Sequence, residues 1–324
     1  MFLHSTFHLT LVANSEKFTK LFERVYSALE YIDENKYADY ALASKGIIIL
    51  YCDSQYKKKI RIIVNPCQLL NSDKSDSEKF VRKLEKRISS YFNHKYQLDD
   101  FELSGVGLRT DIDVRSQEKV SDYLKVLRRV GKVKGFSPSR DNWLDNDISF
   151  CFDGNSNSIK FMLYDLEAMT GEQADDSCFS VTQNSVPDDC EGLLRAEVRL
   201  TKLKAIRGYT NKASASEQIA DLLDSRQKIF LETFMRIVPF GNFYKKDKAE
   251  EIIRAKIKDA TIGRKMLWLV GLVPEKKSLL MAQKSLNYRR IDKVMEAFFN
   301  IEVAPVTISK RHDIKKLDNL YNYL

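Results

Sequence analysis

A chain of 324 residues with 44% apolar and 11% aromatic side chains can bury one large core or two ordinary ones, and this composition excludes a disordered protein. It contains no run of about 18 apolar residues and no basic N-terminal segment followed by an apolar stretch, so neither a membrane span nor a secretory signal is expected. The net charge is +8, and we expect a cytoplasmic protein.

The first 240 residues alternate strand and helix patterns. Alternating or continuous apolar runs predict strands, and apolar residues at three- and four-residue spacing predict helices. The predicted strands are 5–13, 46–52, 60–65, 106–114, 147–153, 158–165 and 192–201, and the predicted helices are 15–32, 76–92 and 117–130. A polar, acidic loop is expected at 171–191. No internal sequence repeat is evident.

From residue 214 onward the pattern becomes wholly helical. The predicted helices are 214–236, 246–258, 260–271, 276–284 and 286–299. The segment 237–245 contains Pro239 and Gly241 and is a plausible boundary. We therefore expect an α+β protein with a largely antiparallel sheet covered by helices in residues 1–240, followed by a basic helical DNA-binding region in residues 241–324.

The excess charge is confined to the last part of the chain. Residues 241–324 hold 18 Lys or Arg and 10 Asp or Glu, whereas residues 1–240 hold 35 of each. A basic segment of this kind is expected of a protein that binds a phosphate backbone. The alternative is a set of lysine-rich helices that simply face solvent.

The five cysteines form no CxxC pair, which favours free thiols over a disulfide framework or a zinc site. Asp111 and Asp113 lie two apart on one predicted strand and therefore on one face. Carboxylates placed in this way suit Mg²⁺ or Mn²⁺, and the alternative is an exposed face paired with lysines.

Glu197 lies in an otherwise apolar strand, where a carboxylate needs a partner. Arg195 and Arg199 share the face of Glu197, so Glu197 could form an ion pair with one of them or could bind a metal ion. Tyr164 ends another apolar strand. A buried tyrosine is usually a core residue, but a tyrosine can also attack phosphorus and hold a DNA end as a phosphotyrosine.

The order of these segments resembles the gene II type replication initiators of filamentous phages and related rolling-circle Rep proteins. The segments that carry the resemblance are Asn65-Pro66 with Gln68-Leu69-Leu70, Arg109-Thr110-Asp111, Ser137-Pro138-Ser139-Arg140-Asp141-Asn142-Trp143, Lys160 with Tyr164 and Glu167, and Gly192 to Arg199. The family often has a lysine two residues after its tyrosine, where this chain has Leu166, and Lys160 could supply that charge.

The resemblance implies a nicking and rejoining endonuclease that starts rolling-circle DNA replication at an origin and works with the host replication machinery. Tyr164 matches the nucleophile, and Tyr209 is the alternative because related plasmid proteins place their tyrosine after the Arg-x-Glu strand. Asp111 and Glu197, with Asp113 as a further candidate, would hold one divalent metal, Mg²⁺ or Mn²⁺. The chain has no His-apolar-His pair, so carboxylates would dominate the ligation. No small-molecule cofactor is expected.

Basic residues on both parts of the chain are candidates for binding DNA. Arg109, Lys160 and Arg195 would contact phosphates near the reaction, and in the helical region the candidates are Arg264, Lys265, Lys284, Arg289 and Arg290. Residues 276–299 could form a helix-turn-helix-like pair around Ser285-Leu286-Asn287. Two alternatives remain: an origin-binding factor or repressor that does not nick, and a relaxase or transposase with the same chemistry.

Overall fold

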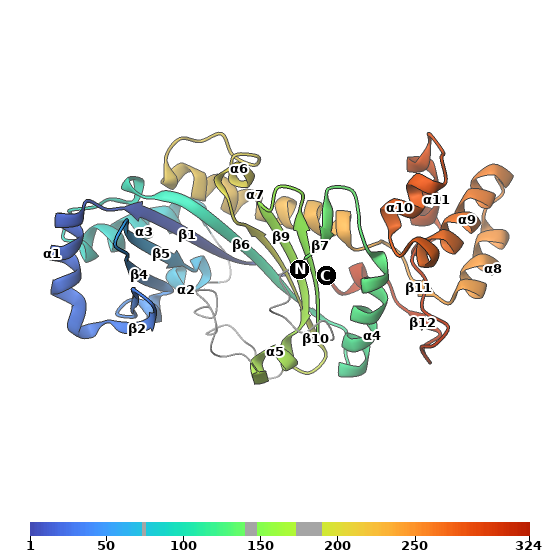
Figure 1. Ribbon diagram of the computed structural model, residues 1–324, viewed down its shortest axis with the longest axis horizontal. Coiled ribbons are helices and arrows are strands. Elements are labelled where there is room, and N and C mark those ends of the chain that lie inside the picture. Colours follow the sequence, from blue (N-terminus) through green and yellow to red (C-terminus); the bar gives the residue numbers. More distant parts are fainter. Residues whose placement is uncertain (73–75, 140–147, 173–189) are drawn as a thin grey trace.

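A ten-stranded antiparallel sheet forms the centre of the protein, in the order β2-β3-β4-β5-β1-β6-β10-β9-β8-β7 (Figure 1). The computed structural model describes residues 1–72, 76–139, 148–172 and 190–324. The strands are β1 (His4–Val12), β2 (Glu30–Asp33), β3 (Lys36–Asp39), β4 (Ile47–Asp53), β5 (Lys58–Val64), β6 (Glu102–Asp113), β7 (Phe136–Pro138), β8 (Ser149–Gly154), β9 (Ile159–Asp165) and β10 (Leu193–Leu200). The expected α+β class with a largely antiparallel sheet and a helical C-terminal region is confirmed.

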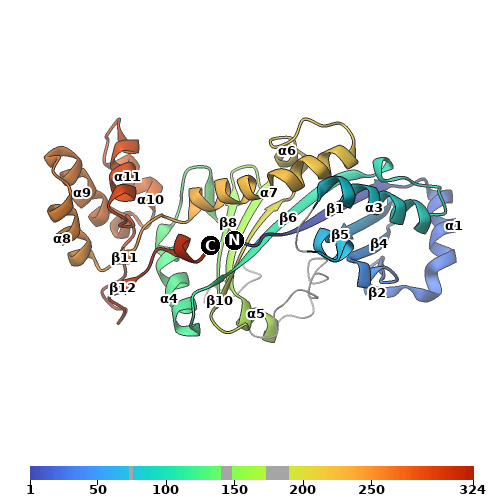
Figure 2. The same cartoon turned by 180° about the vertical axis from the view of Figure 1, so that it is seen from behind.

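Helices pack on one face of this sheet. They include α1 (Ser15–Val25), α2 (Pro66–Leu70), α3 (Ser77–Tyr91), α4 (Gln117–Leu127), α6 (Leu203–Ile206) and α7 (Ala215–Ile237). The short helix α5 (Leu166–Glu172) instead follows β9 at the end of the strands (Figure 1). Phe7 of β1 contacts Phe80 of α3, and Phe161 of β9 contacts Phe234 of α7. Figure 2 shows α7 running across the strands. Because side chains alternate along a strand, the residues next to these phenylalanines point to the opposite face.

The sheet consists of two units with the same order of elements. The first unit, residues 4–91, runs β1, α1, the meander β2 to β5, and α3. The second unit, residues 102–237, runs β6, α4, the meander β7 to β10, and α7. In each unit the last strand of the meander inserts next to the first strand, and the two first strands, β1 and β6, pair antiparallel at the centre. The fold is therefore an internal duplication, although the sequence shows no repeat.

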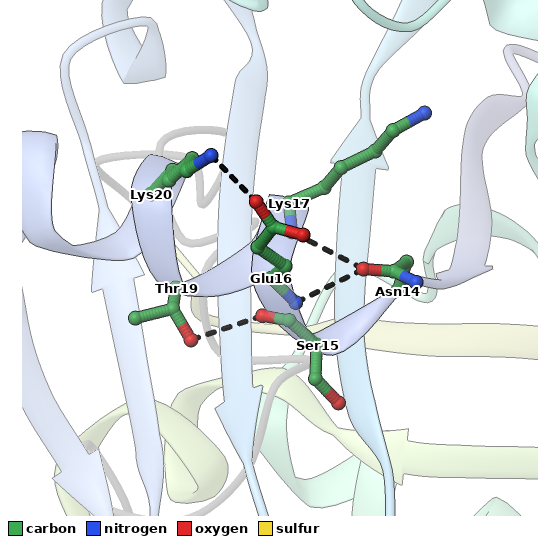
Figure 3. Close-up of polar contacts among 6 residues, drawn as sticks. All are labelled: Asn14, Ser15, Glu16, Lys17, Thr19 and Lys20. Carbon is green, nitrogen blue, oxygen red and sulfur yellow. Dashed lines mark hydrogen bonds and ion pairs between the residues drawn. The ribbon is translucent and has the colours of Figure 1, made fainter.

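Local capping explains why the helix of the first unit begins where it does. The side-chain oxygen of Asn14 accepts hydrogen bonds from the backbone N–H groups of Glu16 and Lys17, at 3.0 and 3.4 Å. Glu16 also pairs with Lys20 at 2.7 Å, one turn further on. Figure 3 shows these contacts and the side chain of Lys17 extending away from them.

Several segments differ from the sequence-based expectation, and two of them have a clear physical reason. The helix predicted over 15–32 ends at Val25, and residues 30–39 form the β2–β3 hairpin. Asn35 occupies the left-handed turn of this hairpin, with φ 57°, and the aromatic pattern before it extended the helix prediction too far. The helix predicted over 260–271 continues to Lys276, because Pro274 falls in its last turns rather than at its centre.

The last part of the chain forms a helical lobe at one end of the molecule (Figure 1). Its helices are α8 (Lys246–Lys256), α9 (Ala260–Lys276), α10 (Leu279–Ser285) and α11 (Ile291–Asn300). The final residues then return to the helices that cover the large sheet, where Tyr321 contacts Phe234 of α7 and Tyr323 contacts Tyr123 of α4. β12 (Lys316–Leu317) pairs with β11 (Phe243–Tyr244), Leu320 is fully buried, and the Tyr321 hydroxyl donates to the Val238 carbonyl at 2.7 Å. The C-terminal tail therefore completes the core beneath α7.

We expect Leu320→Ala to lower the free energy of unfolding by about 2–5 kcal/mol, because it leaves a cavity where the tail meets the sheet lobe. Urea unfolding followed by circular dichroism measures the change. Met281→Ala is the control, since Met281 is 46% exposed and its loss should change the free energy by less than about 0.5 kcal/mol. Equal stability of both variants and the wild type would show that the tail does not contribute to the core.

Candidate active site

Charged side chains line the sheet face opposite α1, α3, α4 and α7. β6, β10 and β9 lie side by side, and their register places Asp111 opposite Arg195 and Arg195 opposite Tyr164. Two residues further along the same pair of strands, Arg109 of β6 lies opposite Glu197 of β10. With Arg199, these side chains form what we call the sheet-face cluster: Arg109, Asp111, Tyr164, Arg195, Glu197 and Arg199. The structure thus brings most of the predicted site residues together on one face.

Asp111 and Arg195 form a two-pronged ion pair across β6 and β10. The Arg195 Nε and Nη2 groups donate to the two carboxylate oxygens of Asp111, at 2.6 and 2.8 Å. Arg195 is only 3% exposed. Burial by itself would lower the pKa of Arg195, but the hydrogen bonds and charge of Asp111 raise it well above its usual range. This guanidinium is permanently charged and held in one orientation.

Glu197 forms the second two-pronged pair, with Arg199 on the same strand. The Arg199 Nε and Nη2 groups donate to the carboxylate at 2.7 and 3.0 Å. Burial would raise the pKa of Glu197, but the charges of Arg199, Arg109 and Arg195 hold it below its ordinary value. Of the two possibilities left open by the sequence, the ion pair is the one that the structure contains.

Tyr164 lies among these charges on β9. Burial is the main cause that raises the pKa of its phenol to about 12, and the Glu197 carboxylate adds to it. The charges of Arg195, Arg199 and Arg109 act in the opposite direction. The cluster contains three guanidinium groups and two carboxylates, so its net charge is positive, and an anionic group such as a phosphate is the ligand that this field favours.

The predicted metal ligands are not gathered around a common point. Asp111 and Glu197 each use both carboxylate oxygens on an arginine. Asp113 is exposed and accepts a hydrogen bond from the backbone N–H of Arg115 at 2.7 Å. Within the described residues, no group of three or more His, Cys, Asp or Glu side chains could hold a metal ion. In this arrangement the donor set does not fit a divalent cation.

Tyr209 lies apart from the sheet-face cluster. It follows α6, packs against the main hydrophobic core and shares a hydrogen bond with Thr233 of α7. Because α7 covers the apolar face, the two candidate tyrosines are on opposite sides of the sheet. Lys160 is on the same face as Tyr164, with its Nζ 3.8 Å from a carboxylate oxygen of Asp153.

The predicted DNA-binding residues of the helical lobe differ in their surroundings. Arg264, Lys284, Arg289 and Arg290 are exposed. Lys265 instead has an internal role: its Nζ donates to the Leu286 carbonyl at 3.4 Å and lies over the rings of Trp268 and Tyr288. α10 and α11 flank a turn at 286–290, so two helices are present as expected, but the second begins at Ile291 and not at residue 286.

Some predictions fall partly outside the described residues. Of the segment 137–143, residues Ser137 to Ser139 are described and Arg140 to Trp143 are not. Residues 173–189 of the expected acidic loop also lie outside. Within the described residues, Cys52, Cys67, Cys151 and Cys190 form no disulfide bond with one another. His8 and Arg61, which lie on the same sheet face in the first unit, were not singled out from the sequence, although their alternation with apolar neighbours places them on one face of β1 and β5.

The chain is distantly similar to a protein of known structure. The structure described as a rolling circle replication initiator protein from Geobacillus stearothermophilus aligns over 96% of this chain and 100% of its own, with 12% identity and a TM-score of 0.33. A scan against protein-family models and a search of the curated proteins find no match. Within the described residues, no helix has the length and apolar character needed to cross a membrane.

The lowered pKa of Glu197 leads to a prediction about acid stability. A carboxylate whose pKa is lower in the folded state than its ordinary 4.5 stabilises the protein above that pH, and this contribution is lost as the pH falls through the lowered value. Glu197→Gln leaves buried arginines without a counter-charge, so we expect it to cost about 3–5 kcal/mol at neutral pH. The difference in stability between the wild type and Glu197→Gln should become smaller as the pH falls from about 5 to about 3.

Urea unfolding at a series of pH values measures this effect. Asp113→Asn is the matched control, because its exposed carboxylate should change stability little at any pH. Stability curves of wild type and Glu197→Gln that stay parallel through the acid range would contradict the assignment of this carboxylate to a buried ion pair.

Proposed function

We propose that this protein is a DNA strand-nicking initiator of rolling-circle replication, with Tyr164 as the nucleophile. The observation that carries the proposal is the position of the Tyr164 phenol on a sheet face among Arg109, Arg195 and Arg199. A nucleophilic oxygen and several fixed guanidinium groups are what an enzyme needs to attack a phosphodiester. The sequence resemblance to rolling-circle initiators agrees with this interpretation.

The proposed reaction exchanges one phosphate ester for another. The phenol oxygen of Tyr164 attacks the phosphorus atom and loses its proton, a bond forms between them, and the bond from phosphorus to the 3′-oxygen breaks. That oxygen takes up a proton and leaves as a free 3′-hydroxyl, from which a host polymerase can extend. The 5′ end stays on the protein as a phosphotyrosine, which conserves the ester for later rejoining.

The arginines supply charge stabilisation in this scheme. Asp111 holds the Arg195 guanidinium in one orientation by accepting two hydrogen bonds from it. Negative charge builds up on the phosphate oxygens as the new bond forms. Guanidinium groups that are already held in place lower the energy of this transition state, because they do not have to move during the reaction. The phenol pKa of about 12 means that Tyr164 keeps its proton at neutral pH until it reacts.

The dependence on Mg²⁺ or Mn²⁺ stays a prediction from the sequence. Both candidate carboxylates are bound to arginines, so we derive no step of the reaction through a metal. This same pairing favours the alternative in which the sheet face binds DNA at an origin without cutting it. One assay separates the two functions, since only a nicking enzyme becomes covalently attached to DNA.

The test uses a library of random-sequence single-stranded DNA labelled at its 3′ end, incubated with the protein in Mg²⁺, in Mn²⁺ or in EDTA. Nicking through a 5′-phosphotyrosine transfers the label to the protein on a denaturing gel. Tyr164→Phe should abolish this transfer and cost at most about 1 kcal/mol of stability, because it removes one oxygen and almost no volume.

Tyr209→Phe is the matched control and should keep the labelled adduct. Loss of the adduct in Tyr209→Phe alone would identify Tyr209, on the opposite side of the sheet, as the nucleophile. DNA binding by the wild type with no adduct under any of the three conditions would favour the binding factor over the enzyme.

The exposed basic residues of the helical lobe lead to a second prediction. We expect the double variant Arg289→Gln, Arg290→Gln to bind duplex DNA more weakly and with a shallower salt dependence. The slope of the logarithm of affinity against the logarithm of salt should fall by roughly 0.9 for each DNA phosphate that the variant no longer neutralises. Lys17→Gln with Lys86→Gln, on helices of the other lobe, removes the same charge, and an equal effect of the two pairs would contradict a DNA-binding role for the helical lobe.

A further inference from the structure

A cavity of about 350 Å³ opens on the same sheet face, in the first unit. Its lining includes His8 and Thr10 of β1, Arg61 and Ile63 of β5, and Leu50 of β4. On the side toward the second unit it is bounded by Arg199, whose guanidinium is paired with Glu197. The cavity is therefore separate from Tyr164 but shares one wall with the sheet-face cluster.

The internal duplication relates this cavity to the sheet-face cluster. In the second unit, Asp111 lies opposite Arg195, and Arg195 lies opposite Tyr164. In the first unit, Thr10 lies opposite Arg61, and Arg61 lies opposite Leu50. Thr10 is two residues before the end of β1, as Asp111 is two residues before the end of β6. The two rows occupy equivalent positions in the two halves of the sheet.

The neighbouring rows match in the same way. Arg109 lies opposite Glu197 in the second unit, and His8 lies opposite Ile63 in the first. The first unit thus keeps an arginine at the position of Arg195 but has Leu50 where the second unit has the tyrosine. It has threonine and isoleucine where the second unit has its two carboxylates.

These replacements change what the site can do. Without a tyrosine at the equivalent position, the cavity lacks the nucleophile proposed for the second unit. Without the carboxylate, Arg61 has no acidic partner of the kind that binds Arg195, and among the described residues no Asp or Glu lines the cavity. His8 adds no charge at neutral pH, because burial and the charge of Arg199 lower its pKa to about 4. Arg61 therefore supplies an exposed positive charge beside hydroxyl and apolar groups, and the carboxylate in the same register row, Glu102, lies one strand further away, beyond Thr10.

We propose that this cavity is a non-catalytic subsite that holds a nucleotide of a single DNA strand, with its phosphate on Arg61. The proposal rests on the proposed function, since the strand would be the one that reacts at Tyr164. The Thr10 and Ser104 hydroxyls lie 2.8 Å apart, and Ser104 donates to the His8 carbonyl at 3.1 Å, so these two side chains form a polar wall beside Arg61. Leu50 and Ile63 belong to a small buried apolar cluster and give the cavity an apolar wall for a base or sugar.

The spacing of the two sites fits one continuous strand. With the ordinary rise along strands and spacing between them, roughly 30 Å separates Arg61 from Arg195. A single strand that reaches both positions spans several nucleotides across the face of β1, β6 and β10. The first unit would then anchor the strand while the second unit acts on it.

The test measures binding of a fluorescent thymidine oligonucleotide of roughly 20 nucleotides, longer than the ~4–16 nucleotides that a small domain covers. Arg61→Gln should weaken binding about threefold to tenfold. It should also lower the salt slope by about 0.7, the value for one phosphate neutralised on a single strand. Lys17→Gln is the matched control, because it removes the same charge from α1 on the other side of the sheet.

Thr10→Asp is a second, independent variant. It keeps Arg61 but places a carboxylate opposite it, as Asp111 is opposite Arg195, and should weaken binding at least as much as Arg61→Gln. Thermal unfolding of Arg61→Gln and Thr10→Asp checks that both are folded.

Oligonucleotide binding by Arg61→Gln equal to that of Lys17→Gln would overturn the proposal. So would an Arg61→Gln variant that loses affinity for free thymidine 5′-monophosphate but not for the oligonucleotide, because the cavity would then hold a free nucleotide. If the wild type forms no covalent adduct but Arg61→Gln still weakens oligonucleotide binding, the nicking chemistry fails and the subsite stands.

Discussion

Two buried guanidinium–carboxylate pairs determine the chemistry of this protein. Asp111 with Arg195 and Glu197 with Arg199 allow charged groups to occupy a sheet face where unpaired charges would be very unfavourable. Each pair is two-pronged, which fixes the guanidinium planes as well as the charges. Together with Arg109 they surround Tyr164 with an excess of positive charge. In the proposed function, a phosphate ester is the substrate that this field attracts, and the phenol is the group that forms a bond to phosphorus.

The duplicated sheet explains why the charged face extends beyond these residues. Both units place an arginine at the same position of the last meander strand, Arg195 in one and Arg61 in the other. The second unit has added carboxylates and a tyrosine around its arginine, whereas the first has threonine, isoleucine and leucine. Such a division would let one half of the sheet hold a DNA strand while the other half reacts with it. The helical lobe adds exposed basic residues at one end of the molecule (Figure 2).

Most of the fold could be predicted from hydrophobic periodicity, because each long strand and helix has an unambiguous apolar pattern. The β2–β3 hairpin could not, since all four residues of β2 are exposed and nothing in their pattern marks a buried face. The clustering of Asp111, Tyr164, Arg195 and Glu197 followed from alternation on neighbouring strands. The pairing of Asp111 with Arg195 did not, because it depends on the register between β6 and β10. Glu197 and Arg199 lie on one face of the same strand, so alternation allowed their ion pair but did not distinguish it from a metal site. The duplication was hidden for a related reason: equivalent positions in the two units share geometry but few side chains.

The most direct test of the central claim is to identify the residue that becomes attached to DNA. The wild-type protein is incubated with the single-stranded library, the covalent adduct is isolated and digested with trypsin and nuclease, and mass spectrometry locates the residual nucleotide. The account predicts a phosphotyrosine linkage at Tyr164, in the peptide that begins at Phe161. A linkage at Tyr209, or at any residue outside the sheet-face cluster, would contradict it.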